Sequence, residues 1–174
     1  QSNMNANEVI ANRGNQIAGK ALLHPNDDIN MSQSSNDTFP TAMHISAVLM
    51  IEDKLIPAVE QLIRTFLRLE KENEGIVKSG RTHLQDATPI KFSQEISGWR
   101  SSLERDKEML QLALTPLREL ALGGTAVGTG LNAPAGFDEK VAEEVSKLTG
   151  KAFRTAPNKF HALTSKDEVV FAHG

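Results

Sequence analysis

Polar side chains that could bind a small anion gather directly before a long apolar repeat. They form the run SSND, from Ser34 to Asp37. Free N–H groups and the positive end of a helix dipole favour a carboxylate or phosphate at such a place, and two serine hydroxyls add hydrogen-bond donors. The alternative interpretation is plain helix capping by Asn36, Asp37 or Thr38. The pattern therefore predicts an anion site, a helix cap, or both.

Two further clusters contain histidine. In GRTHLQDA, His83 follows Thr82, and an imidazole can act as a general acid or base near neutral pH. The alternative is a loop histidine that is hydrogen-bonded to the backbone. The run HPNDD, from His24 to Asp28, could bind an anion or form Asx turns, and its spacing favours turns.

A fourth cluster, GGTAVGTG, is rich in glycine and covers Gly123 to Gly130. It lacks the Lys-Ser/Thr ending of a P-loop, and no predicted strand precedes it as a dinucleotide-binding fold requires. We interpret it as a turn in which the backbone approaches its neighbours closely. The five histidines match no HExxH or comparable pattern and the chain has no cysteine. We therefore expect no metal and no other cofactor.

Helical periodicity positions these clusters. Apolar residues recur at steps of three and four from Val48 to Leu69, and at steps of three, four and seven from Phe92 to Leu117. This spacing predicts two long antiparallel helices. Pro57 lies inside the first and should bend it or weaken one turn. The runs between the helices are expected to be polar loops. The expected helices cover residues 5–20, about 39–73, about 91–120 and 137–148, with a third long helix beginning near Ser165.

Composition places the chain among helical globular proteins. It has 174 residues, 39% hydrophobic and 24% charged, with only 5% aromatic and no tyrosine. Such a core must be mostly aliphatic, which favours long helices packed side by side. A net charge of −3 does not favour binding to nucleic acid. No apolar run reaches the roughly 20 residues that span a bilayer. The polar start at Gln1 and the helical pattern of the last residues suggest an internal piece of a longer chain.

Longer sequence motifs, which follow one another in a fixed order, resemble those of a known family. The runs QSNMNANEVIANR, HPNDDIN, SQSSNDTFPTAMH, GRTHLQDATP, QEISGW, ALGGTAVGTGLN and TAPNKF resemble class II fumarases over essentially the whole chain. Aspartases share the fold and the elimination chemistry. They typically carry Gln at the position of His83 and Thr at that of Ser35, and they lack a counterpart of His24. Adenylosuccinate and argininosuccinate lyases share the fold but match these words poorly.

The resemblance implies an all-α fold, part of the long-helix bundle of the fumarase/aspartase central domain. Residues 1–33 would end an N-terminal helical domain and carry the loop of a second anion site, and residues 34–174 would belong to the central bundle. Family members are homotetramers whose active sites are shared by three subunits. The location implied is the cytoplasm, or the mitochondrion in a eukaryote.

The implied activity is the reversible hydration of fumarate to (S)-malate in the tricarboxylic acid cycle, without a cofactor. In the direction of dehydration, a base removes a proton from malate, the carbanion is held as an aci-carboxylate, and an acid helps hydroxide leave. Hydrogen-bond donors must therefore be aimed at one carboxylate of the substrate. His83 matches the family's active-site histidine, on the acid or water-handling side. The substrate-contacting positions match Thr82, Ser34, Ser35 and Asn36, and the second anion site matches His24, Asn26, Asp27 and Asp28.

Two family segments have no counterpart in these 174 residues. One is a Ser-Gly-Thr that contacts substrate, and the other is a mobile GSSxMPxKxNP loop with the favoured base and a carboxylate-binding lysine. We therefore expect the chain alone to be inactive. The alternatives are a helical oligomerisation scaffold and an aspartase-type ammonia lyase.

Overall fold

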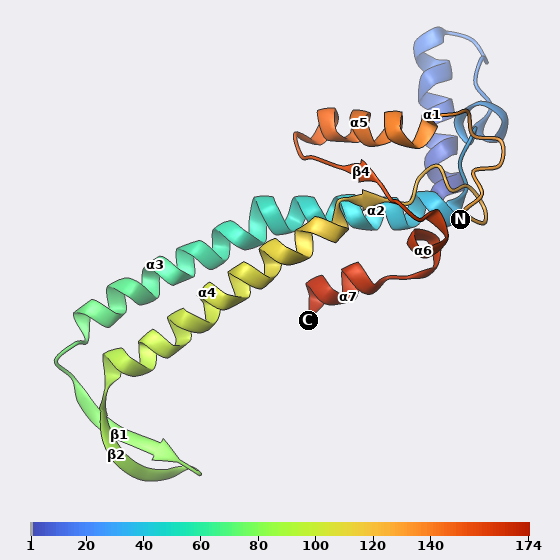
Figure 1. Ribbon diagram of the computed structural model, residues 1–174. Coiled ribbons are helices and arrows are strands. Elements are labelled where there is room, and N and C mark those ends of the chain that lie inside the picture. The colour runs from blue at the N-terminus through green and yellow to red at the C-terminus, as the bar shows by residue number, and fades with distance from the viewer. Residues whose placement is uncertain (1) are drawn as a thin grey trace. The chain divides into compact units, whose positions relative to one another are not determined.

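A computed structural model describes residues 2–174, which divide into two compact units. One unit, called unit 1, contains the residues up to Leu49 together with Thr115–Gly174, and the other, unit 2, is Met50–Leu114. Figure 1 shows the order of the elements along the chain. Helix dominates, as predicted, and the only sheets among residues 2–174 are two ladders of two strands each. No helix in this described part is long and apolar enough to cross a membrane.

The first long helical segment runs from Ser35 to Glu72, close to its predicted range. It consists of α2 (Ser35–Met50), a π-helical turn η2 (Ile51–Leu55) and α3 (Ile56–Glu72). The π turn confirms the predicted effect of Pro57. Proline has no N–H and its ring crowds the carbonyl four residues earlier, and a turn in which the Ile56 N–H bonds to the Ile51 carbonyl widens the helix just before it.

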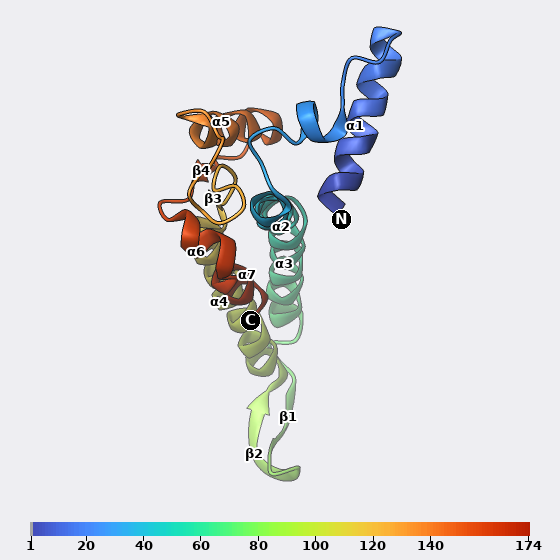
Figure 2. The ribbon, with the colours of Figure 1, turned by 90° about the vertical axis from the view of Figure 1, so that its right-hand side faces the viewer.

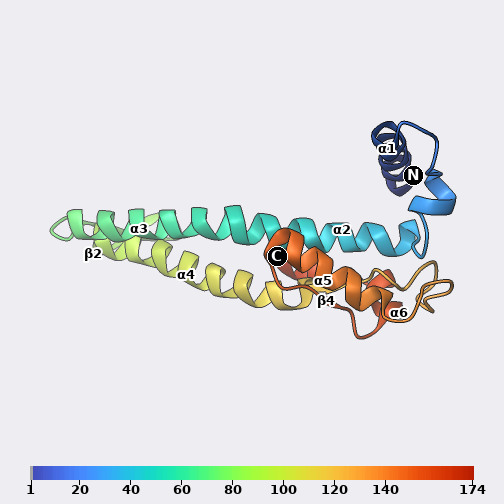
Figure 3. The same cartoon turned by 90° about the horizontal axis from the view of Figure 1, so that it is seen from above.

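Unit 2 holds α3 against α4 (Phe92–Leu117) as antiparallel neighbours (Figure 3). Arg100 Nε lies 2.5 Å from a carboxylate oxygen of Glu70, and Lys107 Nζ lies 3.4 Å from one of Glu60. Residue numbers rise on one helix as they fall on the other, which is the antiparallel arrangement that the apolar spacing predicted.

A β-hairpin joins these two helices, and this corrects the prediction of a polar loop. Strand β1 (Val77–Thr82) pairs with β2 (Gln85–Lys91) in antiparallel register, and Figure 2 shows the hairpin extending from the ends of α3 and α4. His83 and Leu84 form its two-residue turn, with φ of +48° and +61°. Both strands are almost entirely exposed, so no alternation of apolar and polar residues revealed them.

Unit 1 combines α2 with helices from both ends of the chain. Strands β3 (Glu119–Leu120) and β4 (Arg154–Thr155) form a short parallel ladder. The core of unit 1 is mostly aliphatic, as expected, and Val48 and Leu117 are fully buried in it. The remaining helices are α1 (Ser2–Ala18), the π turn η1 (Pro25–Ile29), α5 (Phe137–Thr149), α6 (Lys159–Thr164) and α7 (Asp167–His173).

The helix expected over 137–148 is confirmed as α5, which ends at Gly150 with φ +69°. The stretch before Ser165 differs from the predicted loop because it contains β4 and α6. Asn158 starts α6 by accepting the N–H of His161 at 3.0 Å, a cap that a single asparagine in a polar run does not announce. The following helix, α7, begins at Asp167, close to the expected start.

We expect Leu84→Gly to stabilise the hairpin by up to about 1 kcal/mol. A left-handed Leu costs roughly 1–2 kcal/mol, and the greater chain entropy of Gly offsets part of the relief. Amide hydrogen exchange over residues 77–91 should therefore slow by up to roughly fivefold. Leu84→Val is the control and should speed exchange, because a β-branched residue fits positive φ poorly. Faster exchange in the glycine variant would contradict the strain.

Candidate functional site

Two hydrogen bonds from backbone N–H groups to side chains close the first turn of α2. Ser34 Oγ accepts the Asn36 N–H at 3.2 Å, and Asp37 Oδ1 accepts the Ser34 N–H at 2.8 Å. This is a capping box with Asp in place of the usual Glu or Gln. The cap residue is therefore Ser34, which corrects the prediction of Asn36, Asp37 or Thr38.

The second oxygen of Asp37 binds the glycine-rich turn. Oδ2 accepts the Gly123 N–H at 3.1 Å and the Thr125 N–H at 2.8 Å. The Asp37 residue is fully buried, at 0% exposure. One carboxylate thus ties the start of α2 to residues that lie more than 80 positions later in the chain.

Close backbone approach explains the glycines of this turn, as predicted. A Cβ on Gly123, at φ +95°, would lie 2.4 Å from the Asp138 Cβ. A Cβ on Gly128, at φ +100°, would lie 2.8 Å from the ring of Phe160. Real Cβ atoms do not come this near to fixed neighbours, so side chains are excluded at both positions.

One of the four residues between these two glycines has an unusual conformation. Thr125 has φ +58°, a conformation that a β-branched residue rarely adopts. It is buried, and its hydroxyl oxygen has no hydrogen-bond partner. The next residue, Ala126, offers its carbonyl to the Asn36 side-chain amide at 2.8 Å, a second link between the turn and α2.

A cavity of about 510 Å³ opens beside this junction, within unit 1. Ser34, Ser35 and Thr125 line it from the junction, and Asn26 and Asp27 line it from the HPNDD run. The structure therefore brings part of the predicted substrate-contacting set and part of the predicted second anion site to one cavity. Hydroxyl and amide groups at the start of a helix can donate to a carboxylate here.

The HPNDD run folds as a local turn, which agrees with its spacing. Asp28 Oδ2 accepts the His24 N–H at 2.7 Å, so this carboxylate is used within the turn. His24 Nδ1 accepts the Asp27 N–H at 3.3 Å and lies 3.1 Å from the Asp27 carboxylate, contacts that need opposite protonation states of that nitrogen. His24 and Asp28 are not among the residues that line the cavity. The anion-binding role of the run remains a prediction.

Thr82 and His83 lie in unit 2, at the turn of the hairpin. Both are exposed. A two-residue turn presents the imidazole on a short, geometrically defined connection rather than on a long loop. Their predicted roles, like those of Ser34, Ser35 and Asn36, remain predictions.

A lysine in α6 holds the chain just before the glycine-rich turn. Lys159 Nζ donates to the carbonyls of Leu120 and Leu122 at 3.0 and 2.9 Å and to the Thr155 hydroxyl. Burial lowers the pKa of Lys159, and the nearby carboxylates of Asp138 and Asp37 oppose that shift. The ammonium group is therefore a partly buried cation that depends on its acidic neighbours.

Asp138, at the start of α5, completes this group. Its Oδ2 accepts the Thr155 hydroxyl at 2.6 Å and lies 3.6 Å from Lys159 Nζ. Burial raises the pKa of Asp138, but the Thr155 hydroxyl and the charge of Lys159 outweigh it, and the pKa ends below its ordinary value. The ionised carboxylate is the form that the fold stabilises.

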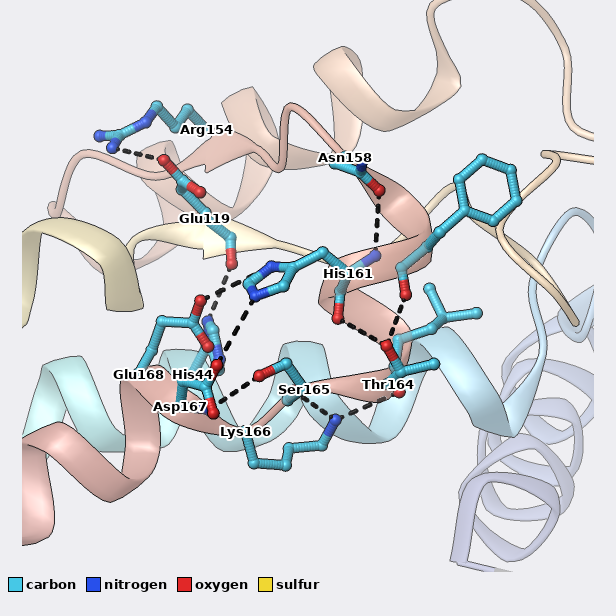
Figure 4. A network of polar contacts seen from close by, with 12 residues as sticks. His44, Glu119, Arg154, Asn158, His161, Thr164, Ser165, Lys166, Asp167 and Glu168 are labelled. Carbon is cyan, nitrogen blue, oxygen red and sulfur yellow. Dashed lines mark hydrogen bonds and ion pairs between the residues drawn. The ribbon is translucent and has the colours of Figure 1, made fainter.

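Another polar network lies along α6 and α7 (Figure 4). His44 on α2 is buried, and its Nδ1–H donates to the Glu119 carbonyl at 2.8 Å, which fixes the tautomer. His161 Nε2 lies 3.9 Å from Asp167 Oδ2, and His161 Nδ1 lies 3.8 Å from Glu168 Oε1. These contacts join α2 to β3 and α6 to α7, and they involve none of the predicted site residues.

Sequence reasoning missed the junction residues Asp37 and Thr125 as parts of the site. Asp37 was visible only as a cap, because the sequence does not show that its second oxygen meets a distant turn. Thr125 gave no signal, since positive φ is expected of Gly or Asn. Among residues 2–174, no group of three or more His, Asp or Glu side chains could hold a metal ion.

The chain belongs to the lyase family, whose profile matches residues 1–174. It is 58% identical over 178 residues to "Fumarate hydratase class II" of Bacillus cereus, covering 100% of this chain and 38% of the relative. It is 59% identical over 179 residues to the protein of the same name from Helicobacter pylori strain J99, covering 100% of this chain and 39% of the relative. The chain thus spans less than half the length of these relatives.

Solved structures agree on the fold. The recombinant class II fumarase from Schistosoma mansoni superposes with a TM-score of 0.93 at 38% identity, over 99% of this chain and 40% of that chain. The fumarate lyase:delta crystallin from Brucella melitensis bound to cobalt superposes with a TM-score of 0.91 at 38% identity, over 98% of this chain and 38% of that chain. The fold is therefore fumarase-like.

Acid sensitivity should follow from Asp138. Its folded-state pKa is lowered, so its contribution to stability is present at neutral pH and is lost as the pH falls below about 4, through the folded-state value. We expect Asp138→Asn to show a smaller loss of unfolding free energy between pH 7 and pH 3 than the parent protein, measured by urea denaturation.

Glu139→Gln is the matched control, because Glu139 is the exposed neighbour on the same helix. That variant should keep the acid dependence of the parent. Identical acid dependence in the Asp138→Asn variant and the parent would contradict the assignment.

Proposed function

We propose that the full-length protein catalyses the reversible hydration of fumarate to (S)-malate. The observation that carries the proposal is the 58–59% identity, over this whole chain, to relatives named class II fumarate hydratase. The test is direct: purified full-length protein supplied with fumarate should form malate without added metal or cofactor. Absence of malate formation by folded protein would contradict the proposal.

The geometry of unit 1 supports a dicarboxylate as the ligand. Ser34 and Ser35 line the cavity at the start of a helix of 16 residues, where N–H groups and the dipole favour negative charge. Asn36 is not among the residues that line this cavity, but its amide donates to the carbonyl of Ala126, which does line it. We propose that these three residues donate to one carboxylate of the substrate and to the aci-carboxylate that forms from it.

Thr82 and His83 complete the proposed set. Thr82 would add a hydroxyl donor to the substrate, and His83 would act on the acid or water-handling side of the reaction. The exposed hairpin turn leaves the imidazole available for such a role. The proton-abstracting serine and the carboxylate-binding lysine would come from the GSSxMPxKxNP loop of the family, which these 174 residues do not contain. We therefore propose that the 174 residues alone do not turn over fumarate.

The second anion site would use His24, Asn26, Asp27 and Asp28. Asn26 and Asp27 share the cavity wall with Ser34 and Ser35. Because Asp28 and the His24 backbone are bound to each other, we propose that these two residues shape the turn while Asn26 faces the ligand.

Assembly as a homotetramer is also proposed. Several large apolar residues of unit 2 are exposed on α3 and α4, a pattern that long helices show when other subunits cover them. Residues 1–33 would then end an N-terminal domain and residues 34–174 would belong to the central bundle, in a protein of the cytoplasm or mitochondrion. The exposed residues are Leu62, Leu67, Trp99, Met109 and Leu112.

An aspartase-type ammonia lyase is the alternative activity. His83, Ser35 and His24 favour the hydratase, since aspartases typically differ at these positions. Full-length protein given fumarate and ammonium should yield malate and no aspartate. Formation of aspartate would contradict the hydratase and would support the ammonia lyase.

We expect His83→Asn in the full-length protein to lower kcat by at least about 10²-fold with a smaller change in KM. General acid–base groups typically contribute 10²–10⁴-fold, and a contact made mainly in the transition state lowers turnover more than affinity. Asn keeps a polar side chain of similar reach but cannot exchange a proton near pH 7. Steady-state kinetics are measured beside the melting temperature of the variant.

His24→Asn serves as the comparison and should leave kcat nearly unchanged while weakening the binding of dicarboxylate at the second site. A folded His83→Asn variant with normal turnover and only a lower melting temperature would show that His83 merely shapes the hairpin. The family assignment would then stand on the remaining residues.

A further inference from the structure

We infer that Asp37 is a positioning residue for the reaction, holding the substrate-binding donors in place without touching the ligand. The inference rests on the proposed function, because it assumes that Ser34, Ser35 and Asn36 bind a dicarboxylate. Asp37 follows these three residues directly and is fully buried at the base of the helix that carries them.

The hydrogen bonds of Asp37 exceed what a helix cap needs. A cap needs only the bond from the Ser34 N–H to Asp37 Oδ1 and the bond from the Asn36 N–H to Ser34 Oγ. Oδ2 instead binds two backbone N–H groups, of Gly123 and Thr125, that belong to another segment. A buried carboxylate is costly unless it is paired or hydrogen-bonded, and these three N–H groups, together with the Lys159 charge, meet that requirement.

The bonds fix two walls of one cavity relative to each other. Ser34 and Ser35 line it from α2, and Thr125 and Ala126 line it from the turn. Asn36 adds a bond from its amide to the Ala126 carbonyl, so the donors and the turn are joined twice. Positive φ at Thr125 shows that the junction holds the turn in a conformation that a threonine does not prefer.

The distinction from a purely structural role lies in what moves when the carboxylate is lost. Asp37→Asn has the same shape, but its NH₂ group must face at least one of the three N–H donors, and two donors repel. The first turn of α2 and the turn at 123–126 then separate, and the donors leave their places. Substrate binding should suffer beyond any loss of global stability.

The test uses the full-length protein and fumarate. We expect Asp37→Asn to raise KM by at least roughly 10-fold, since a buried donor left unpaired is worth 1–3 kcal/mol and 1.4 kcal/mol is tenfold. The matched control is Asp138→Asn, the same substitution at another carboxylate of unit 1 that does not bond to residues 34–36. It should lower the melting temperature and leave KM within about twofold of the parent.

Two kinetic outcomes would overturn the inference. One is a normal KM in folded Asp37→Asn protein with a reduced melting temperature, which is the purely structural result. The other is an equal rise in KM in both variants, which would indicate general loosening of unit 1. If the parent protein itself forms no malate, the proposed function fails, and that result is separate from either of these.

A second measurement covers the case in which Asp37→Asn does not fold. Saturating fumarate should slow amide hydrogen exchange of the parent protein at residues 123–126 as well as at 34–37, because Asp37 couples the two segments. Exchange in the middle of α4, at residues 100–110 of unit 2, is the internal reference and should change less. Protection gained at 34–37 with none at 123–126 would overturn the coupling.

Discussion

A single buried carboxylate, Asp37, determines how unit 1 is put together. Its two oxygens accept three backbone N–H groups, one from the start of its own helix and two from the glycine-rich turn. A charge without water must keep such partners, so neither segment can move away without leaving it unsatisfied. The wall of the cavity, with its serine hydroxyls, follows from this constraint.

A partly buried cation on α6 complements the carboxylate. Lys159 binds the carbonyls of Leu120 and Leu122, just before the residues whose N–H groups bind Asp37. The turn therefore presents its acceptors to a lysine and its donors to an aspartate. Asp138 then balances the lysine from α5, so that three helices, α2, α5 and α6, meet at one short stretch of backbone. The glycines are required there because the backbone is approached from several sides.

The predicted site residues divide between this rigid junction and the hairpin of unit 2. The serines proposed to bind a carboxylate belong to the junction, and His83, proposed to act on the acid or water-handling side, belongs to a two-residue turn. The proposed reaction needs both kinds of group, donors that hold the charge of an aci-carboxylate and a side chain that can exchange a proton. This division explains how one chain that spans about 38% of its relatives can carry several elements of the proposed chemistry.

The sequence by itself determined the long helices, the perturbation at Pro57, the end of α5 at Gly150 and the close approach of the glycine-rich turn. Each depends on a local pattern: 3–4 apolar spacing, a missing N–H, or a residue without Cβ. The sequence motifs that resemble those of class II fumarases are also short, continuous runs of residues. The sequence did not predict the hairpin, because its strands bury no face and its turn residues are His and Leu rather than Asn and Gly. Only the tertiary structure decided that Asp37 binds Gly123 and Thr125, because hydrogen bonds between segments more than 80 residues apart leave no spacing in the sequence.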